Sequence, residues 1–294
     1  SRLQTDLSSY LNVIHAKKRF HGEILVAKGE DVLFNKAIGL SSIEDNIPNK
    51  PGGIYRVASI TKTFTASLIA IAHEESKLNF EDKVRGHIKG LPDKFGDLTI
   101  HQLLTHTSGL PHNEAIEGYW PVKSKIHLST EQVVDEIKKV DLISPPGKER
   151  HYSSLGYYLL AVIIENVYQD TFQNILKAKI LDRQHLKYSG SGDVTNLIHG
   201  FTSGYHLVND DSIVVAPYRN YSMLKGAGDL YTSSVDLLKW NVAFFSDKVT
   251  KAKTKDVMLM SHLSGNPLLQ QGYAWLIENE PRRKYFHGGG TWGY

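Results

Sequence analysis

The sequence predicts a mixed α/β protein, in which an antiparallel β-sheet flanked by helices carries an inserted, mainly helical domain. Strand-like runs gather near both ends of the chain, and the middle is dominated by helical patterns. The composition, 41% hydrophobic and 22% charged over 294 residues, is that of an ordinary globular protein. We expect residues 1–76 and 206–294 to form a discontinuous sheet domain, with residues 77–205 as the helical insertion.

The first part of the chain supplies a helix, a hairpin and a second helix. Residues 5–18 are typical of a helix. Residues 22–28 and 31–37 alternate between apolar and polar positions around a tight turn at Gly29-Glu30, which predicts an antiparallel hairpin. An apolar helix is then expected from Ser59 to about Ser76.

Capping patterns begin the helices of the middle part. Thr99 with Gln102, and Ser129 with Gln132, resemble capping boxes. The break Pro145-Pro146-Gly147 then separates the second of these helices from a strongly apolar one. The predicted helices run from 99 to a stop at 108–109, from 129 through 140, from 154 to 168, and from 171 to 181.

Strand patterns return near the end of the chain. Residues 212–216, 272–277 and 284–287 are predicted to be strands. Between them, Ser233 to Asp236 resembles the start of a helix that runs through Phe245. A cleft between such a sheet and the helical insertion is a usual place for an active site.

The composition excludes several classes of function. A net charge of +3 and a pI near 8.7 are too mild to indicate nucleic-acid binding. The longest apolar run, residues 157–164, is far short of the roughly 20 residues that a transmembrane helix requires. Because the chain has no cysteine, disulfides, thiolate metal sites and cysteine nucleophiles are excluded. No signal peptide is expected, because residues 1–6 are typical of a mature or trimmed start.

Ser59 and Lys62 are three residues apart at the start of an apolar run, residues 63–72. On a helix this spacing places both side chains on one face, with Cβ atoms roughly 5–6 Å apart. A neutral lysine amine at that distance can take the hydroxyl proton, and the serine then becomes a nucleophile. The helix N-terminus also favours developing negative charge. The alternative is that Ser59 is an ordinary N-cap.

Ser222 and Lys225 have the same spacing as Ser59 and Lys62. They precede residues 226–228, a flexible glycine-containing loop with no following helix to anchor the pair. We therefore predict that this second pair is a coincidence.

Two further clusters have residue types that suit catalysis. Tyr152 and Ser154 follow the break at residues 145–147 and can project from a loop into a cleft; a tyrosine near a lysine can relay a proton. The alternative is a packed Tyr152 at a helix start. His287 and the glycines Gly288, Gly289 and Gly290 end a strand-like run, and consecutive glycines can present backbone N–H groups to a ligand. The alternative is a simple glycine-rich loop.

Other enzyme classes lack their signatures in this chain. There is no Gly-x-Ser-x-Gly elbow and no phosphate-binding glycine loop. His101 and His106 are five apart and do not match a His-Glu-x-x-His zinc helix, so we expect His106 to hydrogen-bond within its loop. We expect no metal and no other cofactor.

These clusters, near residues 60, 150 and 290, match the order of the three elements of penicillin-binding proteins and β-lactamases. The chain resembles the serine β-lactamase-like family that includes class C β-lactamases, D-alanyl-D-alanine carboxypeptidases and related esterases. The resemblance runs from about residue 20 to the end, and it is carried by residues 55–65, 103–110, 146–147 with 152–153, 226–233 and 287–289.

The resemblance implies a role for each matching residue. Ser59 would be the acylated nucleophile and Lys62 the amine that deprotonates it. Tyr152 would protonate the leaving group and later help to activate the deacylating water. The backbone N–H groups of Ser59 and Gly290 would form the oxyanion hole. His287, in place of the usual lysine, would face the substrate's carboxylate or the Tyr152–Lys62 network.

The sequence departs from the family pattern at three places. Ser154 stands where an asparagine usually contacts the substrate's amide, and it offers one hydroxyl instead. His287 carries only partial positive charge near neutral pH, which weakens the case for a carboxylate-bearing substrate. The family pattern also implies further strands and a final helix after Tyr294.

The sequence therefore predicts a serine hydrolase that works through an acyl-enzyme on an amide or ester. We expect a penicillin-binding-protein-like D-amino-acid peptidase or a β-lactamase-related hydrolase, acting on a small-molecule or peptide substrate. A carboxylesterase of the same fold, and a catalytically weak penicillin-binding or sensor module, are the alternatives. The resemblance also implies an exported protein.

Overall fold

The computed structural model describes residues 2–17, 20–193, 198–209, 212–263 and 269–294. The α-helices of this part of the chain are α1 (Arg2–Ala16), α2 (Thr61–Glu74), α3 (Val84–His87), α4 (Ile100–Leu104), α5 (Thr130–Lys139), α6 (Ser154–Tyr168), α7 (Phe172–Leu176), α8 (Ser234–Phe245) and α9 (Ala252–Leu259). Its strands are β1 (Gly22–Lys28), β2 (Asp31–Ile38), β3 (Leu40–Ser42), β4 (Ile47–Pro48), β5 (Ile54–Arg56), β6 (Gly190–Ser191), β7 (Tyr205–Asn209), β8 (Ser212–Val215), β9 (Leu230–Ser233), β10 (Leu269–Gln271), β11 (Leu276–Glu278) and β12 (Lys284–Phe286).

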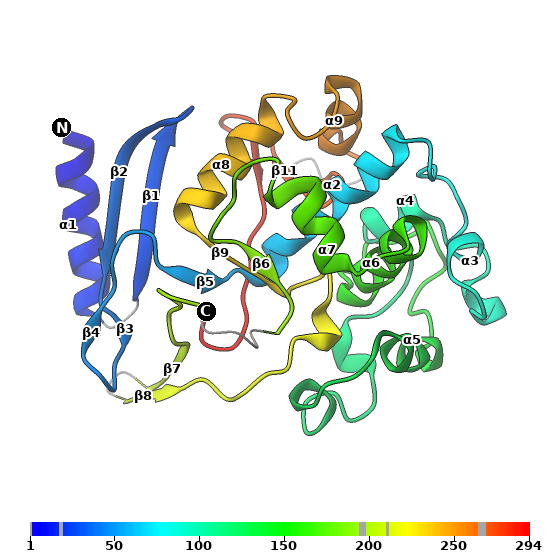
Figure 1. Ribbon diagram of the computed structural model, residues 1–294, viewed down its shortest axis with the longest axis horizontal. Coiled ribbons are helices and arrows are strands. Elements are labelled where there is room, and N and C mark those ends of the chain that lie inside the picture. The colour runs from blue at the N-terminus through cyan, green and yellow to red at the C-terminus, as the bar shows by residue number, and fades with distance from the viewer. Residues whose placement is uncertain (1, 18–19, 194–197, 210–211, 264–268) are drawn as a thin grey trace.

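The elements are arranged in two regions that meet around α2. Figure 1 shows α1 and the β1–β2 hairpin on one side, with α3, α5 and α6 on the other and β5 and β9 between them. The end of the chain lies near the middle, close to β5 and β7 (Figure 1). The predicted division into domains at residues 76 and 206 stays a prediction.

The strands pair antiparallel, and the predicted mixed α/β class is confirmed. The hairpin of β1 and β2 is also confirmed, with Gly22 opposite Ile38 and Lys28 opposite Asp31. The described strands form several small sheets where one was expected: β1–β2, β3–β4, β5–β9–β6, β7–β8 and β10–β11–β12. Most of these strands are two to five residues long, and no sheet in the described residues has more than three strands.

Several predicted boundaries change in the structure. The strand predicted at residues 272–277 is wrong over its first half, because the Gly272 N–H donates to the Trp275 carbonyl at 2.8 Å and closes a turn. The helix predicted from residue 99 has its capping box but ends at Leu104. After α7, residues 177–181 form a π-helical turn.

The core is built mainly by α2 and α6, which pack against each other. Residues 61–72 of α2 and 154–164 of α6 are buried on all sides, and α6 is apolar along most of its length. The ring of Phe64 stacks on Trp240 of α8 at a centroid distance of 4.0 Å. Because the two helices pack together, the first turn of α2 lies against the start of α6.

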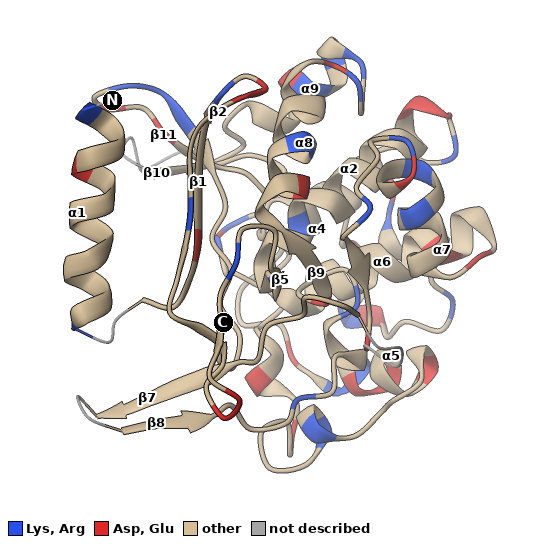
Figure 2. Ribbon diagram, turned by 60° about the vertical axis from the view of Figure 1, so that its left-hand side comes forward, with Lys and Arg blue, Asp and Glu red and all other residues tan. Residues whose placement is uncertain are grey.

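The charges on the surface are mixed in sign. Figure 2 shows Lys and Arg next to Asp and Glu along the helices, and on α1 Arg2 lies 3.7 Å from Asp6. None of the helices in the described residues is both long and apolar enough to cross a membrane.

Candidate active site

Ser59 lies in a short 3-10 turn, Ala58–Ile60, that leads directly into α2. The predicted helix therefore starts as a tighter turn, and Ser59 precedes its first α-helical residue. Ala58 has a φ of 43°, in the left-handed region that an alanine rarely adopts. Such strain persists only where the surroundings hold the backbone, and it is common beside active-site residues.

Lys62 lies in the first turn of α2, and its amine reaches Ser59. The Nζ atom is 3.2 Å from Ser59 Oγ, 3.2 Å from Ser154 Oγ and 2.7 Å from the carbonyl oxygen of Ala227. The side chain is fully buried, with 0% exposure. A neutral amine has two hydrogens and one lone pair. If Ala227 and Ser154 accept the two hydrogens, the lone pair can accept the hydroxyl hydrogen of Ser59.

The surroundings of Lys62 favour the neutral amine. Burial lowers the pKa of Lys62 to about 7, because a charged amine loses its hydration in the protein interior. The carboxyl group of Asp229, also fully buried, acts in the opposite direction and raises it. At neutral pH a large fraction of Lys62 can therefore accept a proton.

Tyr152 is placed beside the Ser59–Lys62 pair, just before α6. The Nζ atom of Lys62 lies 4.8 Å from the centre of its ring. Burial raises the pKa of Tyr152 to about 12, against the opposing effect of a hydrogen bond with Ser59. The phenol is therefore protonated at neutral pH, which suits donation of a proton to a leaving group better than removal of one.

The glycine-containing segment after β12 lies against the backbone of Val57 and Ser59. A Cβ atom on Gly289 would be 2.1 Å from the carbonyl oxygen of Val57 and 3.1 Å from the nitrogen of Ser59. Gly288 and Gly290, in contrast, have open space at that position. Only Gly289 therefore needs to lack a side chain for this close approach. The oxyanion role of the Ser59 and Gly290 N–H groups stays a prediction.

His287 faces Tyr152, with a distance of 6.5 Å between the ring centres. Burial, followed by the nearby charge of Lys62, lowers the pKa of His287 to about 4. Its Nδ1 donates to the carbonyl of Gly288 at 2.6 Å. The imidazole is therefore neutral at neutral pH and supplies no positive charge for a carboxylate.

Two cavities flank Ser59 and share Gly290 as a wall. The first, of about 260 Å³, is lined by Arg150, Tyr152, Gln271, Leu276 and the residues from His287 to Gly290. The second, of about 280 Å³, is lined by Ala58, His112, Asn113, Glu114, Trp120, Ser154, Arg219, Leu224, Ala227, Gly228, Thr291 and Trp292. The structure thus brings Ser59, Lys62, Tyr152, Ser154 and the residues from His287 to Gly290 to one place.

An aromatic pair lines the second cavity. The rings of Trp120 and Trp292 stack at a centroid distance of 5.4 Å and an angle of 10°. The guanidinium of Arg219 lies 5.5 Å from the Trp120 ring and donates to Thr291 Oγ1 at 3.1 Å. Sequence reasoning missed this group, because three distant segments of the chain supply it.

His112 and Glu114 were also missed. His112 Nε2 is 3.1 Å from Ser154 Oγ, and His112 Nδ1 is 2.6 Å from a carboxylate oxygen of Glu114. Residues 103–110, which resemble the family, end just before His112 and Glu114. That proximity was the one sequence signal that could have indicated these two residues. His106 is buried, and it accepts a hydrogen bond from the Ser153 N–H at 3.2 Å rather than from its own loop.

The second Ser-x-x-Lys pair has separate partners. Lys225 forms an ion pair with Glu165 at 2.9 Å, and Ser222 Oγ accepts from the Leu128 N–H at 3.1 Å. Both side chains thus stabilise contacts with the helical region.

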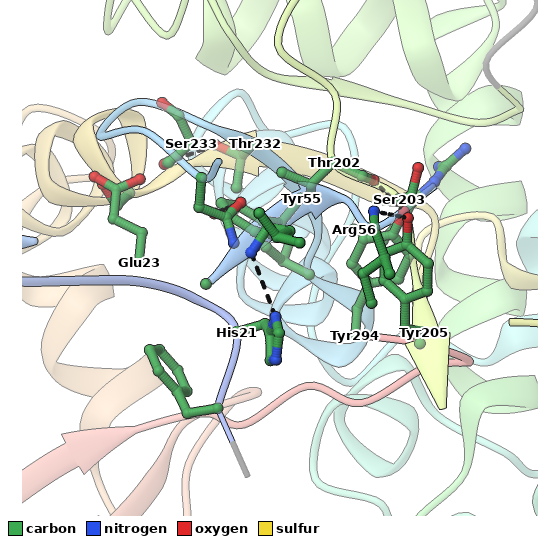
Figure 3. Close-up of a pocket in the computed structure, with 18 of the residues that line it drawn as sticks. His21, Glu23, Tyr55, Arg56, Thr202, Ser203, Tyr205, Thr232, Ser233 and Tyr294 are labelled. Carbon is green, nitrogen blue, oxygen red and sulfur yellow. Dashed lines mark hydrogen bonds between the residues drawn. The ribbon is translucent and has the colours of Figure 1, made fainter. Parts of the chain in front are cut away.

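A third cavity, of about 550 Å³, does not have Ser59 among its lining residues. Figure 3 shows His21, Tyr55, Tyr205 and Tyr294 around it. Polar side chains on its wall take part in structural hydrogen bonds: Ser233 caps α8, Ser234 donates to Glu23 at 2.7 Å, and His21 accepts from the Leu40 N–H at 3.4 Å. Of the three cavities described here, only the two at Ser59 contain a serine hydroxyl within hydrogen-bonding distance of a buried lysine amine.

Comparison with known proteins agrees with this geometry. Penicillin-binding protein 4* of Bacillus subtilis is 27% identical over 306 residues, which cover 98% of this chain and 67% of that protein. The octameric penicillin-binding protein homologue from Pyrococcus abyssi has a TM-score of 0.86 at 24% identity, over 97% of this chain and 68% of that one. The D-amino acid amidase from Ochrobactrum anthropi has a TM-score of 0.80 at 21% identity, over 92% of this chain and 79% of that one.

The two structural likenesses show the β-lactamase/transpeptidase-like fold. The sequence model described as Beta-lactamase matches residues 14–294, nearly the whole chain. The chain therefore belongs to the Beta-lactamase family.

Proposed function

We propose that the protein is a serine hydrolase that forms an acyl-enzyme on Ser59. The observation that carries the proposal is the buried amine of Lys62, which lies 3.2 Å from Ser59 Oγ and has a pKa of about 7. A serine hydroxyl needs such a base to become nucleophilic at neutral pH. Membership of the family supports the same mechanism.

The residues at the site can divide the chemistry into two balanced steps. In acylation, Ser59 Oγ attacks the carbonyl carbon and Lys62 takes its proton, while Tyr152 gives a proton to the leaving amine or alcohol. In deacylation, water attacks the acyl carbon and loses a proton to the same network, and Ser59 Oγ regains a proton as it leaves. The N–H groups of Ser59 and Gly290 would stabilise the oxyanion in both steps.

We propose an amide of a D-amino acid, as in a D-amino-acid peptidase, as the first substrate class to test. Penicillin-binding proteins and a D-amino acid amidase are among the proteins that the chain is similar to. The stacked Trp120 and Trp292 offer an apolar wall for a side chain of the acyl group.

A carboxylesterase of the same fold is the second candidate, and two observations favour it. Ser154 offers one hydroxyl where an amide-contacting asparagine is usual, and Lys62 and His112 already occupy that hydroxyl. The neutral His287 supplies no charge for a substrate carboxylate. An ester has no amide N–H to satisfy, and it does not need either group.

Covalent labelling tests the mechanism. The protein is incubated with a labelled penicillin and, separately, with a fluorophosphonate, and the adduct is located by mass spectrometry. We expect the adduct on Ser59 and none in the Ser59→Ala variant. Absence of a label on Ser59 from both reagents would overturn the proposed mechanism.

Turnover then separates the candidate activities. Initial rates are measured with a D-amino acid amide, a D-alanyl-D-alanine peptide, a cephalosporin and a simple aryl ester. Activity on esters alone would favour the carboxylesterase and contradict the peptidase. Stoichiometric labelling of Ser59 without turnover of any substrate would instead identify a penicillin-binding or sensor module.

A further inference from the structure

A continuous hydrogen-bonded chain connects the buried amine of Lys62 with a carboxylate at the mouth of the second cavity. Lys62 Nζ is 3.2 Å from Ser154 Oγ, which is 3.1 Å from His112 Nε2. The other ring nitrogen of His112, Nδ1, is 2.6 Å from Glu114. Serine, histidine and carboxylate thus follow one another as in a catalytic triad, but the serine contacts the lysine base.

The direction of each hydrogen bond follows from the groups involved. The carboxylate of Glu114 can only accept, so Nδ1 of His112 carries a hydrogen and Nε2 presents its lone pair. Ser154 therefore donates its hydroxyl hydrogen to Nε2. The oxygen of Ser154 remains free to accept a hydrogen from the Lys62 amine. The links from Lys62 to Ser154 and from Ser154 to His112 are thus oriented for proton movement from Lys62 towards His112.

The two ends of this chain differ in their access to water. Lys62 is 0% exposed and Ser154 is 4% exposed, whereas the side chains of His112 and Glu114 are 37% and 49% exposed. A buried ammonium cannot exchange its proton with solvent without an intervening group. Ser59, which is partly exposed and 3.2 Å from Lys62 Nζ, is one such group while its hydroxyl is free. Ser154 and His112 together provide a second, which stays open while Ser59 carries an acyl group.

Hydrolysis creates a need for such an exit. In ester hydrolysis the carboxylic acid product ionises at neutral pH and the alcohol takes up no proton, so each turnover leaves one proton over, and Lys62 is the base nearest Ser59. In amide hydrolysis the released amine takes up that proton, so the exit matters most for esters. Tyr152 offers a poor exit, because its pKa of about 12 keeps the phenol protonated. A charged Lys62 cannot activate Ser59 for the next cycle.

We propose that Ser154, His112 and Glu114 form a proton relay that returns Lys62 to its neutral form; the proposal rests on the acyl-enzyme function proposed above. The ammonium of Lys62 passes a proton to Ser154 Oγ as Ser154 passes its hydroxyl proton to His112 Nε2. The resulting imidazolium is stabilised by Glu114 and then loses its Nε2 proton to water. Ser154 and His112 recover their starting forms, and the net change is one proton moved from Lys62 to solvent.

The relay predicts a separation between the first and later turnovers. In His112→Ala, acylation of Ser59 should still give a burst of about one equivalent of product, because Lys62 starts neutral. The steady-state kcat should fall by about 10- to 100-fold with a much smaller change in KM, as expected for lost proton transfer. The solvent deuterium isotope effect on kcat should rise, because proton transfer then limits the cycle.

Chemical rescue distinguishes a relay from a structural role. Added imidazoles should restore kcat in His112→Ala, and the restored rate should depend on the pKa of the imidazole used. Ser154→Ala should lose a similar fraction of kcat. Added imidazoles should not rescue it, because the missing hydroxyl lies between Lys62 and the ring of His112, which is still present. Glu114→Gln, which keeps the size of the side chain, should show a smaller loss.

His87→Ala is the matched control. His87 also pairs with a carboxylate, Asp82, at 3.0 Å, but it lines neither cavity at Ser59. Its kcat should equal that of the unmodified protein. The relay is contradicted if His112→Ala and Glu114→Gln keep full kcat, if rescue fails while the fold is intact, or if the fluorophosphonate labels Ser154. Absence of any burst or Ser59 adduct in the unmodified protein would instead contradict the acyl-enzyme function.

Discussion

Burial of a single lysine sets the pH dependence that the site should show. In the proposed mechanism only a neutral Lys62, whose pKa is about 7, activates Ser59. We expect kcat/KM for an uncharged ester to rise through about pH 7 and then to level off, since the base must be unprotonated. Rates measured across the neutral range test this. A profile that falls over this interval would contradict the role of Lys62 as the base.

Asp229 provides a check on that assignment. Its charge raises the pKa of Lys62, so Asp229→Asn should move the rise in kcat/KM to lower pH. The side chain is fully buried and accepts from the Gly226 N–H at 3.0 Å, so thermal unfolding of the variant must be measured alongside. A shift to higher pH would show that another group titrates.

The same burial should reduce stability. The pKa of Lys62 lies below its usual value near 10.5, so between about pH 7 and 10.5 the unfolded chain binds one more proton than the native state. The native state therefore becomes more stable as pH rises through that window. Lys62→Met removes the cost of burying the amine, and at pH 7 it should raise the free energy of unfolding by about 2 kcal/mol.

Urea unfolding of the Lys62→Met variant at several pH values tests this. The gain should shrink towards pH 10.5, where the native lysine no longer differs from the unfolded one, and the variant should be inactive. A variant that is less stable than the unmodified protein at every pH would mean that the hydrogen bonds of Lys62 outweigh its desolvation.

Among single residues, those with a local pattern were the predictable ones. Ser59 and Lys62 share a helix face, and their sequence spacing already shows this. His112 contacts Ser154, which is 42 positions away in the chain, and no local pattern encodes such a contact. The sequence therefore pointed to Ser59, Lys62 and Tyr152 but missed His112, Glu114 and the aromatic pair of the second cavity.

At the scale of elements, the three glycines that follow β12, Gly288 to Gly290, should differ in how much activity is lost when each is replaced by alanine. Gly289→Ala places a methyl group 2.1 Å from the Val57 carbonyl, so the strand must move away from the nucleophile. Because displacement by about 1 Å can cost about 100-fold in rate, we expect a loss of that order in kcat/KM.

Gly288→Ala and Gly290→Ala are the matched controls for this strand. An added Cβ meets nothing within 4 Å at either position, so the strand need not move, and both variants should lose clearly less kcat/KM than Gly289→Ala even though each methyl group enters the first cavity. Kinetics of the three variants, with thermal unfolding to verify the fold, measure the contrast. Equal losses of kcat/KM at all three positions would show that the segment needs glycines for backbone flexibility and not for close packing against Val57.

Helix starts and the first hairpin were predictable because their signals are local. The capping boxes at Thr99 and Ser129 are both present. The error at residues 272–277 has a different origin. Tyr273 and Trp275 are buried, at 2% and 7% exposure, but they reach the core from a turn. Buried side chains produce the same apolar sequence pattern whether the backbone that carries them is a turn or a strand.

At the scale of the whole molecule, Arg150 connects two regions that meet at the first cavity. It precedes α6, and its Nε and Nη2 atoms donate to Gln271 Oε1 of β10 at 3.1 and 3.0 Å. Its guanidinium also lies 6.0 Å from the Tyr152 ring centre. Arg150→Met leaves the buried oxygen of Gln271 without this donor, which should cost about 1–3 kcal/mol of stability.

We expect Arg150→Met to lower kcat/KM by about 10-fold as well, because Tyr152 loses a neighbour that fixes its position. Thermal unfolding and ester kinetics measure both effects. Lys94→Met, which breaks the exposed ion pair with Asp141 at 2.8 Å, is the control and should change neither. Loss of stability with unchanged kcat/KM would show that the contact serves the fold alone.

The whole-molecule arrangement was predictable as a class but not in detail. Strands near both chain ends indicated an α/β protein with antiparallel pairing. The division into small sheets depends on which short strands meet in space, as β5, β6 and β9 do from three distant segments. The expected export of the protein stays a prediction.

The stacked tryptophans at the second cavity give the molecule an intrinsic optical signal. Of the four tryptophans in the chain, Trp240 and Trp275 are buried at 2% and 7% exposure, so an arriving ligand leaves their surroundings unchanged. Trp120 and Trp292 line the cavity itself. Occupation of that cavity should alter the ultraviolet emission of this pair alone, so substrate entry could be timed in stopped-flow experiments without an attached dye.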